Sequence, residues 1–397
     1  MKKKSWWIIL LSIVIAASAA VAIYASSAEK GYIAVDKKDL KQKDFLDDKD
    51  ALLYFSTAAD QDTFGGGKSY ALFAGQNGSL SSFKMRGLEQ GSAGVNGESV
   101  MLEDKKTIFT IKNGLTAYDR TYQHTGDSAG YVGDQNGFYT LYNSGFDKDG
   151  NHYRSELYRQ FNGKWKKDVI PYYIRASGFD GDSIYALIPT DDEKGYKILK
   201  IRTDQKDLTY ETIAEWTYKE GTSVESQLAS DQESVHFVVR GEKADNIYQM
   251  VKVDKKSGKV ELYDIATYKN DEQVLYDSMP FSFKKSFFSY QKYLYFIDGF
   301  GKVYQINSQT GKSKPAFTLS QEKMKADFKE IHRKGDKLYF LTYSYNKPAN
   351  IEQYSLKTGK KLNDKEIEDV KKVVTPKSHL KLYDFQVLKG FDRKKEI

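Results

Sequence analysis

The most informative absence from this chain is cysteine, of which there is none among 397 residues. Without cysteine the chain has no disulfide, no cysteine-ligated zinc or iron–sulfur site, no thiol nucleophile and no lipid-modified cysteine. Proline is scarce, with six residues, and only two of the four tryptophans, Trp165 and Trp216, lie beyond the N-terminal segment. Stability therefore has to come from packing.

Neither positive nor negative charge is concentrated in one part of the chain. The 61 lysines and arginines are balanced by 54 aspartates and glutamates, and the net charge of +7 includes Lys2, Lys3 and Lys4. Nucleic-acid-binding proteins gather basic residues in a patch or stripe, whereas here lysine alternates with acidic residues almost throughout. Nucleic acid is therefore not an expected partner, while an anionic envelope polymer stays open.

One hydrophobic run is long enough to cross a bilayer. It begins at Trp6, ends at Tyr24, contains neither charge nor proline, and follows the three lysines. At about 1.5 Å per residue a helix over this run matches the hydrocarbon core, and the lysines favour a cytoplasmic N-terminus. We expect residues 1–24 to be a cytoplasmic tip and a single-pass anchor in the cell membrane, with the C-terminal domain extracellular.

A cleaved signal peptide has the same charge layout. Small residues at 20–22 and 26–28 would suit a signal peptidase, so secretion after cleavage near Ala28 is the alternative. The run is longer than the usual core of about 7 to 15 residues, which favours an anchor. Residues 25–50 are polar and charge-rich without sustained periodicity, and we expect them to form a stalk before a domain over 51–397.

Beyond the stalk, short aromatic and β-branched runs alternate with Gly, Asn, Asp and Lys turns, which is typical of antiparallel strands. Three strands end in a similar turn, at Gly258, Gly311 and Gly359. These glycines recur about every 50 residues, a period typical of propeller blades. We predict an all-β propeller of four-stranded antiparallel blades, seven in number, with six or eight as alternatives. The expected blade starts are Ala51, Ala93, Ser128, Ile174, Ser226, Phe281 and Phe328.

Two features near the C-terminus complete the predicted domain. Residues 363–374 open like a capping box and place Ile367, Val370 and Val374 on one face before Pro376, which predicts a short helix. Residues 380–388 form a late strand. We expect this strand to pair with the first blade, because an unclosed ring would leave two exposed sheet edges.

One repeat carries a family resemblance. Residues 301–312, Gly-Lys-Val-Tyr-Gln-Ile-Asn-Ser-Gln-Thr-Gly-Lys, resemble the repeat of quinoprotein-like (PQQ-type and WD40-like) propellers, in which Gly-x-Val-Tyr leads to Asp-x-x-Thr-Gly-Lys. The resemblance covers one blade well and two partly, and implies a bacterial extracytoplasmic β-propeller. It bears on fold and not on activity, because quinone enzymes and non-catalytic envelope propellers share such repeats. The family's tryptophan is missing at 313–317, so no quinone cofactor is expected.

Two short motifs match known signatures in surroundings that do not fit them. Residues 126–130, Gly-Asp-Ser-Ala-Gly, resemble the nucleophile elbow of esterases, which needs a helix after the serine. Turn residues follow instead, so we expect a turn between blades. Residues 65–69, Gly-Gly-Gly-Lys-Ser, lack the first glycine of a phosphate loop, where Asp62 stands, and no helix follows.

A calcium loop is the one candidate ligand site. Asp147, Asp149 and Asn151 place oxygen ligands at alternating positions, although an EF-hand loop would need glutamate where Tyr158 stands. The same residues also suit an Asp-Gly hairpin turn. The five histidines occur singly, without metal-binding spacing.

These observations leave no assigned catalytic residue. The expected function is a non-catalytic, membrane-anchored extracytoplasmic propeller that binds or scaffolds an envelope protein, peptide or cell-wall polymer, with no cofactor apart from the calcium loop. The alternative is an exported enzyme, a lyase or hydrolase, whose site lies in the central channel and is assembled from residues distant in sequence. The sequence leaves the oligomeric state open.

Overall fold

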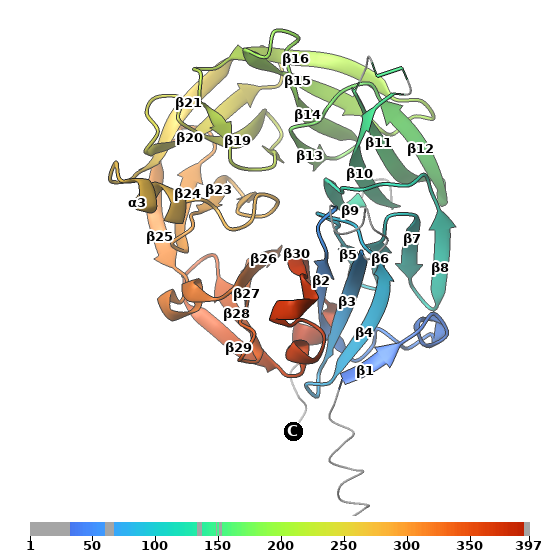
Figure 1. The fold of residues 1–397 in the computed structure, drawn as a ribbon. Helices are drawn as coiled ribbons and strands as arrows, with labels where there is room; N and C mark the ends of the chain where they lie inside the picture. Colours follow the sequence, from blue (N-terminus) through green and yellow to red (C-terminus); the bar gives the residue numbers. More distant parts are fainter. Residues whose placement is uncertain (1–31, 60–66, 133–136, 148, 151–152, 393–397) are drawn as a thin grey trace, which may run out of the picture.

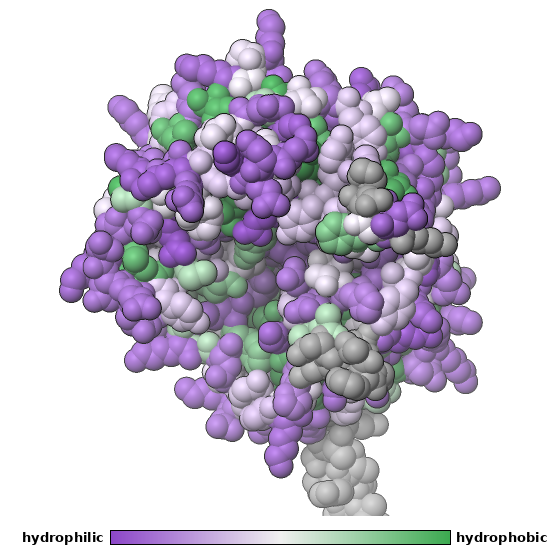
Figure 2. All heavy atoms as spheres, turned by 45° about the horizontal axis from the view of Figure 1, so that its top comes forward, coloured by the Kyte–Doolittle hydropathy of each residue, from purple (hydrophilic) through white to green (hydrophobic). Residues whose placement is uncertain are grey.

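The computed structural model describes residues 32–59, 67–132, 137–147, 149–150 and 153–392. These residues form seven β-sheets arranged as blades around a central axis (Figure 1). In every blade, the successive main strands pair antiparallel from the axis to the rim, which confirms the predicted seven-bladed propeller of four-stranded blades. Figure 2 shows a largely hydrophilic periphery and a hollow near the middle of the ring.

In the first four blades the strands follow chain order from the axis outward, with one extra strand at each edge of blade 1. Blade 1 contains β30 (Lys381–Val387), β2 (Lys49–Ser56), β3 (Lys68–Gly75), β4 (Leu80–Arg86) and β1 (Tyr32–Val35). Blade 2 contains β5 (Gly94–Asn96), β6 (Ser99–Glu103), β7 (Thr107–Ile111) and β8 (Leu115–Asp119). Blade 3 contains β9 (Ser128–Val132), β10 (Gly137–Phe146), β11 (Tyr153–Phe161) and β12 (Lys164–Ile170). Blade 4 contains β13 (Ala176–Asp180), β14 (Ser183–Pro189), β15 (Gly195–Arg202) and β16 (Thr209–Thr217).

The remaining blades follow the same order. In blade 5 two short strands, β17 (Ser223–Val224) and β18 (Ala229–Ser230), pair with β19 (Ser234–Arg240), followed by β20 (Ile247–Asp254) and β21 (Val260–Thr267). Blade 6 contains β22 (Phe287–Tyr290), β23 (Tyr293–Ile297), β24 (Lys302–Asn307) and β25 (Ser313–Thr318). Blade 7 contains β26 (Phe328–Lys334), β27 (Lys337–Tyr343), β28 (Ala349–Ser355) and β29 (Lys361–Ile367). Helical elements that lie within the described residues include α3 (Glu272–Asp277), η1 (Asp39–Lys41), η2 (Gln321–Lys325), η3 (Val370–Lys372), η4 (Pro376–Ser378) and η5 (Lys389–Asp392).

Ring closure joins the two ends of the described chain. The strand expected near 380–388 is β30, which pairs antiparallel with β2, with Lys381 opposite Ser56 and Val387 opposite Ala51. β30 is thus the inner strand of a blade whose other strands come from the opposite end of the chain. Closure removes the exposed inner edge that β2 would otherwise present.

The helix expected at 363–374 is not formed. Residues 363–367 belong to β29, the outer strand of blade 7, and only the short turn η3 follows. The apolar residues at helical spacing are buried, since Ile367, Val370 and Val374 all pack between blades 7 and 1. The apolar spacing thus belongs to buried residues, but pairing with β28 decided the backbone conformation of the first half of the segment.

The prediction of a stalk over residues 25–50 is also wrong for residues 32–50, the part that the structure describes. β1 pairs parallel with β4 as a fifth strand of blade 1, and β2 begins at Lys49. Between them Leu40 and Phe45 pack on the core between blades 1 and 2. Residues 25–31 of the stalk and the predicted anchor at 6–24 lie outside the described residues. Within the described ranges, no helix is long and apolar enough to cross a membrane.

The hydrophobic core lies between blades and not along the axis. The described residues form seven buried clusters, and each joins two neighbouring blades. Aromatic rings make many of these contacts; Trp216 of blade 4 packs edge-on against Phe237 of blade 5 with ring centroids 5.8 Å apart. A polar contact adds to one interface, where the buried Arg159 donates to the carbonyl oxygens of Thr203 and Gln205.

The three repeat glycines explain how the sequence repeat serves the interface between blades. Gly258, Gly311 and Gly359 have φ values of 70°, 69° and 69°, which glycine adopts without strain. A Cβ on these glycines would overlap, respectively, the backbone of Ile213, the ring of Tyr263 and the ring of Phe317. Each of these residues lies on the outer strand of the preceding blade. Glycine-tipped turns thus dock successive blades where the sequence lacks the tryptophans of the quinoprotein repeat.

Candidate functional site

A cavity of about 400 Å³ opens at the end of the axis where the chain enters the inner strands. Its walls come from blades 1, 3, 5 and 7 and from the connections leading into blades 2, 3, 4 and 6. We call it the central cavity. It is lined by Gln90, Asp127, Asn143, Tyr173, Ile174, Arg175, Gln227, Phe281, Ser282, Phe283, Lys284, Glu330, Leu382 and Tyr383.

Polar side chains near the start of the inner strands link neighbouring blades around this cavity. Between blades 3 and 4, the Ser177 hydroxyl donates to Asp127 Oδ2 at 3.2 Å, and it lies 3.0 Å from the Ser128 hydroxyl. Between blades 4 and 5, the backbone N–H of Ser177 donates to Gln227 Oε1. Between blades 1 and 2, the backbone N–H of Ala93 donates to Asp384 Oδ2 at 2.7 Å.

Two consecutive lysines from the connection into blade 6 reach across the ring. Lys284 Nζ donates to the hydroxyl of Ser92 at 2.6 Å and to the backbone oxygen of Gln90, both next to blade 2. Lys285 Nζ donates to the Asp384 carboxylate and, at 2.6 Å, to the backbone oxygen of Phe385 in blade 1. Neither lysine makes these bonds to the adjacent blade 7. The two side chains therefore link the connection into blade 6 to blades 1 and 2 across the ring.

Burial changes the acidity of several groups around these lysines. The pKa of Glu330 is raised to about 7, because desolvation outweighs the nearby Lys285 charge and the hydrogen bonds that favour the carboxylate. Burial also raises the pKa of Asp127, which Lys284 partly offsets, and lowers the pKa of Lys284 itself. His332, further along β26, has a pKa well below its ordinary value because of burial and the Lys285 charge. The site thus holds a carboxyl group that changes its charge near neutral pH.

Aromatic rings surround the polar groups. The Arg175 guanidinium lies over the Phe283 ring at 5.2 Å and donates to the backbone oxygen of Val224. In the same connection, Tyr173 contacts Tyr153, and Tyr153 contacts Phe146, with ring centroids 5.1 and 5.2 Å apart. Phe146 is 63% exposed. Exposed rings next to hydrogen-bonding groups suit a ligand with both apolar and polar faces.

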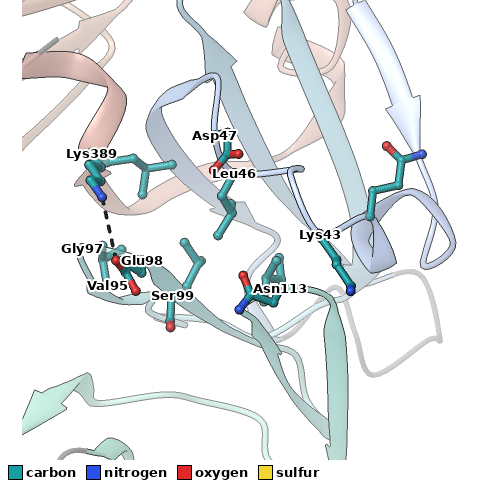
Figure 3. Close-up of a pocket in the computed structure, with 13 residues that line it drawn as sticks. Lys43, Leu46, Asp47, Val95, Gly97, Glu98, Ser99, Asn113 and Lys389 are labelled. Carbon is teal, nitrogen blue, oxygen red and sulfur yellow. Dashed lines mark ion pairs between the residues drawn. The ribbon is translucent and has the colours of Figure 1, made fainter.

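A second, smaller cavity of about 200 Å³ lies between blades 1 and 2 (Figure 3). The segment that includes Lys43 and Leu46 forms one wall, and the loops around Glu98 and Asn113 form another. Lys389 and Glu98 face each other at 3.8 Å, but both side chains are mostly exposed. No buried charged side chain lines this cavity. We interpret it as a gap left where the N-terminal segment packs on blades 1 and 2.

The two enzyme-like motifs both run into β-strands. Gly126 and Asp127 end the connection from blade 2, whereas Ser128, Ala129 and Gly130 are the first residues of the inner strand β9, which pairs antiparallel with β10. The predicted inter-blade turn is therefore correct only for the first two residues of the Gly-Asp-Ser-Ala-Gly motif. Lys68 and Ser69 of the phosphate-loop-like segment are the first residues of β3, and its first two glycines lie outside the described residues.

The calcium prediction remains untested. Asp147 and Asp149 lie between β10 and β11, and Asn151 is outside the described residues. In the described ranges, no group of three or more His, Asp or Glu side chains is placed to hold a metal ion.

Sequence reasoning missed the residues that build the central cavity. Lys284, Lys285, Glu330 and Asp384 belong to no motif, and they lie far apart in the chain. One signal was available: polar or charged residues recur at or near the start of each inner strand, where propeller geometry turns side chains toward the axis. Asp127 lies inside the serine motif, but that pattern singles out its neighbour Ser128.

Comparison with known proteins agrees with this fold. A family model described as "YycP, beta-propeller domain" matches residues 44–388. The uncharacterized protein YycP of Bacillus subtilis (strain 168) is 68% identical over 362 residues, which cover 91% of this chain and 94% of that protein.

Solved structures resemble the chain more remotely. Apo AztD from Citrobacter koseri overlaps 86% of this chain and 98% of its own at 12% identity, with a TM-score of 0.43. BamB from Moraxella catarrhalis overlaps 70% of this chain and 75% of its own at 12% identity, with a TM-score of 0.42. The predicted resemblance to bacterial β-propellers is confirmed at the level of fold, and the chain belongs to the YycP β-propeller domain family.

Proposed function

We propose that this chain is a membrane-anchored, extracytoplasmic propeller that binds an envelope protein, peptide or polymer in its central cavity. The composition of the cavity carries the proposal. Aromatic rings, amides and charges of both signs converge on about 400 Å³ from widely separated parts of the chain. A concave site with a few fixed polar groups among aromatic walls has the character of a ligand-binding site.

A binding role fits better than catalysis because most of the cavity's polar groups are already committed. Lys284 and Lys285 hold Ser92 and Asp384 across the ring, and Gln227 accepts from the Ser177 backbone. Asn143 is likewise bonded to the Ile174 backbone. Groups that fix one another build a rigid receptor, which lowers the entropic cost of binding.

Anchoring through residues 6–24 is part of the proposal, with the N-terminus cytoplasmic and the propeller outside. The support is the uncharged run after three lysines. If the native protein sediments intact with membranes and a protease added to whole cells degrades the propeller, the anchor is supported. A released protein that begins after Ala28 would show secretion instead.

Photo-crosslinking in cells tests the binding role. A photoreactive phenylalanine analogue would replace Tyr173 or Tyr383, both in the cavity wall, in the full-length chain. Tyr210, 41% exposed on the outer strand β16, is the matched control. We expect a discrete crosslinked product from both cavity positions and not from the control. Equal products at all three positions, or none at the cavity, would contradict the proposal.

An exported enzyme is the second candidate, and one observation favours it. Glu330 and Asp127 both line the cavity, and burial raises the pKa of both, that of Glu330 to about 7. A carboxyl group with a pKa near the working pH can act as a general acid or base. Turnover of a hydrolase or lyase substrate panel by the full-length protein, abolished in Glu330→Gln, would replace the binding proposal with this one.

A calcium ion at Asp147, Asp149 and Asn151 remains part of the proposal for the neighbouring hairpin. Binding should raise the melting temperature on addition of calcium, and the rise should vanish in Asp147→Asn with Asp149→Asn. If calcium leaves the melting temperature of the native protein unchanged, the hairpin does not bind a calcium ion.

A further inference from the structure

A groove leads outward from the central cavity between blades 6 and 7. It encloses about 510 Å³ and is bounded by Tyr276, Met279, Phe281, Phe300 and Met324. We call it the rim groove. Tyr276 and Met279 are 71% and 40% exposed, which places large apolar side chains in water next to a concave surface. Such an exposed apolar hollow with a polar border is typical of an interaction site.

Hydrogen bonds hold the walls of the groove in place. Gln321 donates to the backbone oxygen of Phe300 at 2.8 Å, and Lys329 donates to that of Met324 at 2.9 Å. The loop next to Phe300 approaches α3 closely, since the Gly299 N–H donates to the Ser278 oxygen at 2.9 Å. A Cβ at Gly299 would overlap the backbone oxygens of Asp277 and Met279. The groove is therefore formed before any partner arrives.

Three hollows adjoin one another through shared lining residues. Phe281 lines both the central cavity and the rim groove. Lys325 lines both the rim groove and a further hollow of about 260 Å³ on blade 7, beside Tyr343 and Pro348. A series of adjoining hollows fits an extended chain better than a compact small molecule, because successive groups of a chain can occupy successive hollows.

The border of the groove is positively charged. Lys323, Lys325, Lys329 and Lys347 line the rim groove and the adjoining hollow, against the two carboxylates Asp277 and Glu322. This excess of positive charge would speed the encounter with a negatively charged partner and would orient that partner in the groove. The methionine side chains of the groove can adapt to different apolar groups, which suits amino-acid side chains.

We infer that the rim groove binds an extended, acidic polypeptide segment, with an apolar side chain inserted between Met279, Phe300 and Met324. The inference rests on the proposed function, whose ligand it specifies as a peptide. The acidic residues of the segment lie along the lysines, and the segment continues over Phe281 toward the central cavity.

Selection from a library of displayed random short peptides tests this with the full-length protein in detergent. We expect enrichment of peptides that combine Asp or Glu with Phe, Leu or Met. Affinity of one enriched peptide should fall at least about fivefold in Lys325→Glu with Lys329→Glu, and again in Met279→Ala. The matched controls are Lys312→Glu with Lys314→Glu on blade 6 and Leu362→Ala on β29, which should leave affinity unchanged.

Three outcomes would overturn the inference and leave the proposed function standing. The first is enrichment of peptides whose binding is lost in Glu330→Gln but kept in the groove variants, which would place the ligand in the central cavity alone. The second is equal competition by polyglutamate, which lacks apolar side chains and would indicate an anionic polymer. The third is failure to enrich any peptide together with a positive crosslink from Tyr173, which would reject a peptide ligand and keep the central cavity as a binding site.

Discussion

Lys285, in the connection into blade 6, donates to the carboxylate of Asp384 in blade 1, although blade 7 separates the two blades in the ring. Asp384 is 2% exposed and also accepts the backbone N–H of Ala93, so one carboxylate joins blades 6, 1 and 2. Because β30 closes the ring, this carboxylate fastens the closing strand to blades that are far away in sequence.

The first prediction concerns this ion pair. Lys285→Met should destabilise the folded state by about 2–4 kcal/mol, because it leaves a buried carboxylate without its cation. Urea unfolding at neutral pH measures the change. Lys314→Met, on the exposed outer strand β25, is the control and should change stability by less than about 0.5 kcal/mol. Equal effects of the two variants would show that the pair contributes nothing specific.

The second prediction is a pH dependence from Glu330. Its folded pKa of about 7 lies above the ordinary value of 4.5, so the folded state holds more protons between those pH values. Stability due to this group is full below about pH 4.5 and is lost as the pH rises to about 7. Glu330→Gln, which stays neutral, should be more stable than the native chain at pH 8 by up to about 3 kcal/mol.

Unfolding curves of both proteins from pH 4.5 to 8 provide the measurement. The native chain should lose stability relative to Glu330→Gln across that window. A constant difference between the two proteins would mean that Glu330 titrates normally in the fold.

The third prediction concerns Arg159, whose side chain is 2% exposed. It pairs with Asp168 at 2.8 Å and donates to three backbone oxygens, of Thr203, Gln205 and Lys206 in the neighbouring blade. Arg159→Lys should cost about 2–4 kcal/mol, since an ammonium group cannot reach these divergent acceptors. Arg202→Lys, at an exposed pair with Asp204, is the matched control. A melting temperature that drops equally in both would refute the assignment.

The fourth prediction concerns the repeat glycines. Gly311→Ala should destabilise the fold by about 2–3 kcal/mol, because a Cβ there meets the Tyr263 ring of blade 5 in addition to the positive-φ cost. Gly335→Ala is the control: Gly335 has a φ of 60°, but its added Cβ would have open space. Chemical denaturation should show a clearly smaller loss for Gly335→Ala. Similar losses would mean that the turn docks no blade.

The sequence predicted the fold class and blade count for a physical reason. Strand alternation and turn glycines are local properties, and a propeller repeats one local unit, so the pattern at Gly258, Gly311 and Gly359 was sufficient. Local reasoning failed at 363–374, where the spacing of Ile367, Val370 and Val374 suits a helix as well as a buried strand end. Antiparallel pairing with β28 made residues 363–367 a strand and not a helix.

The site depended on tertiary structure far more than the fold did. By itself the sequence determined a cysteine-free, all-β ring, the absence of a fitting catalytic motif and the hydrophobic run at 6–24. Only the closed ring brought Lys284 and Lys285 to Ser92 and Asp384, because residues about 100 or more positions apart meet when seven blades share one axis. The raised pKa of Glu330 follows from burial among those groups, and burial is a property of the assembled ring rather than of any segment.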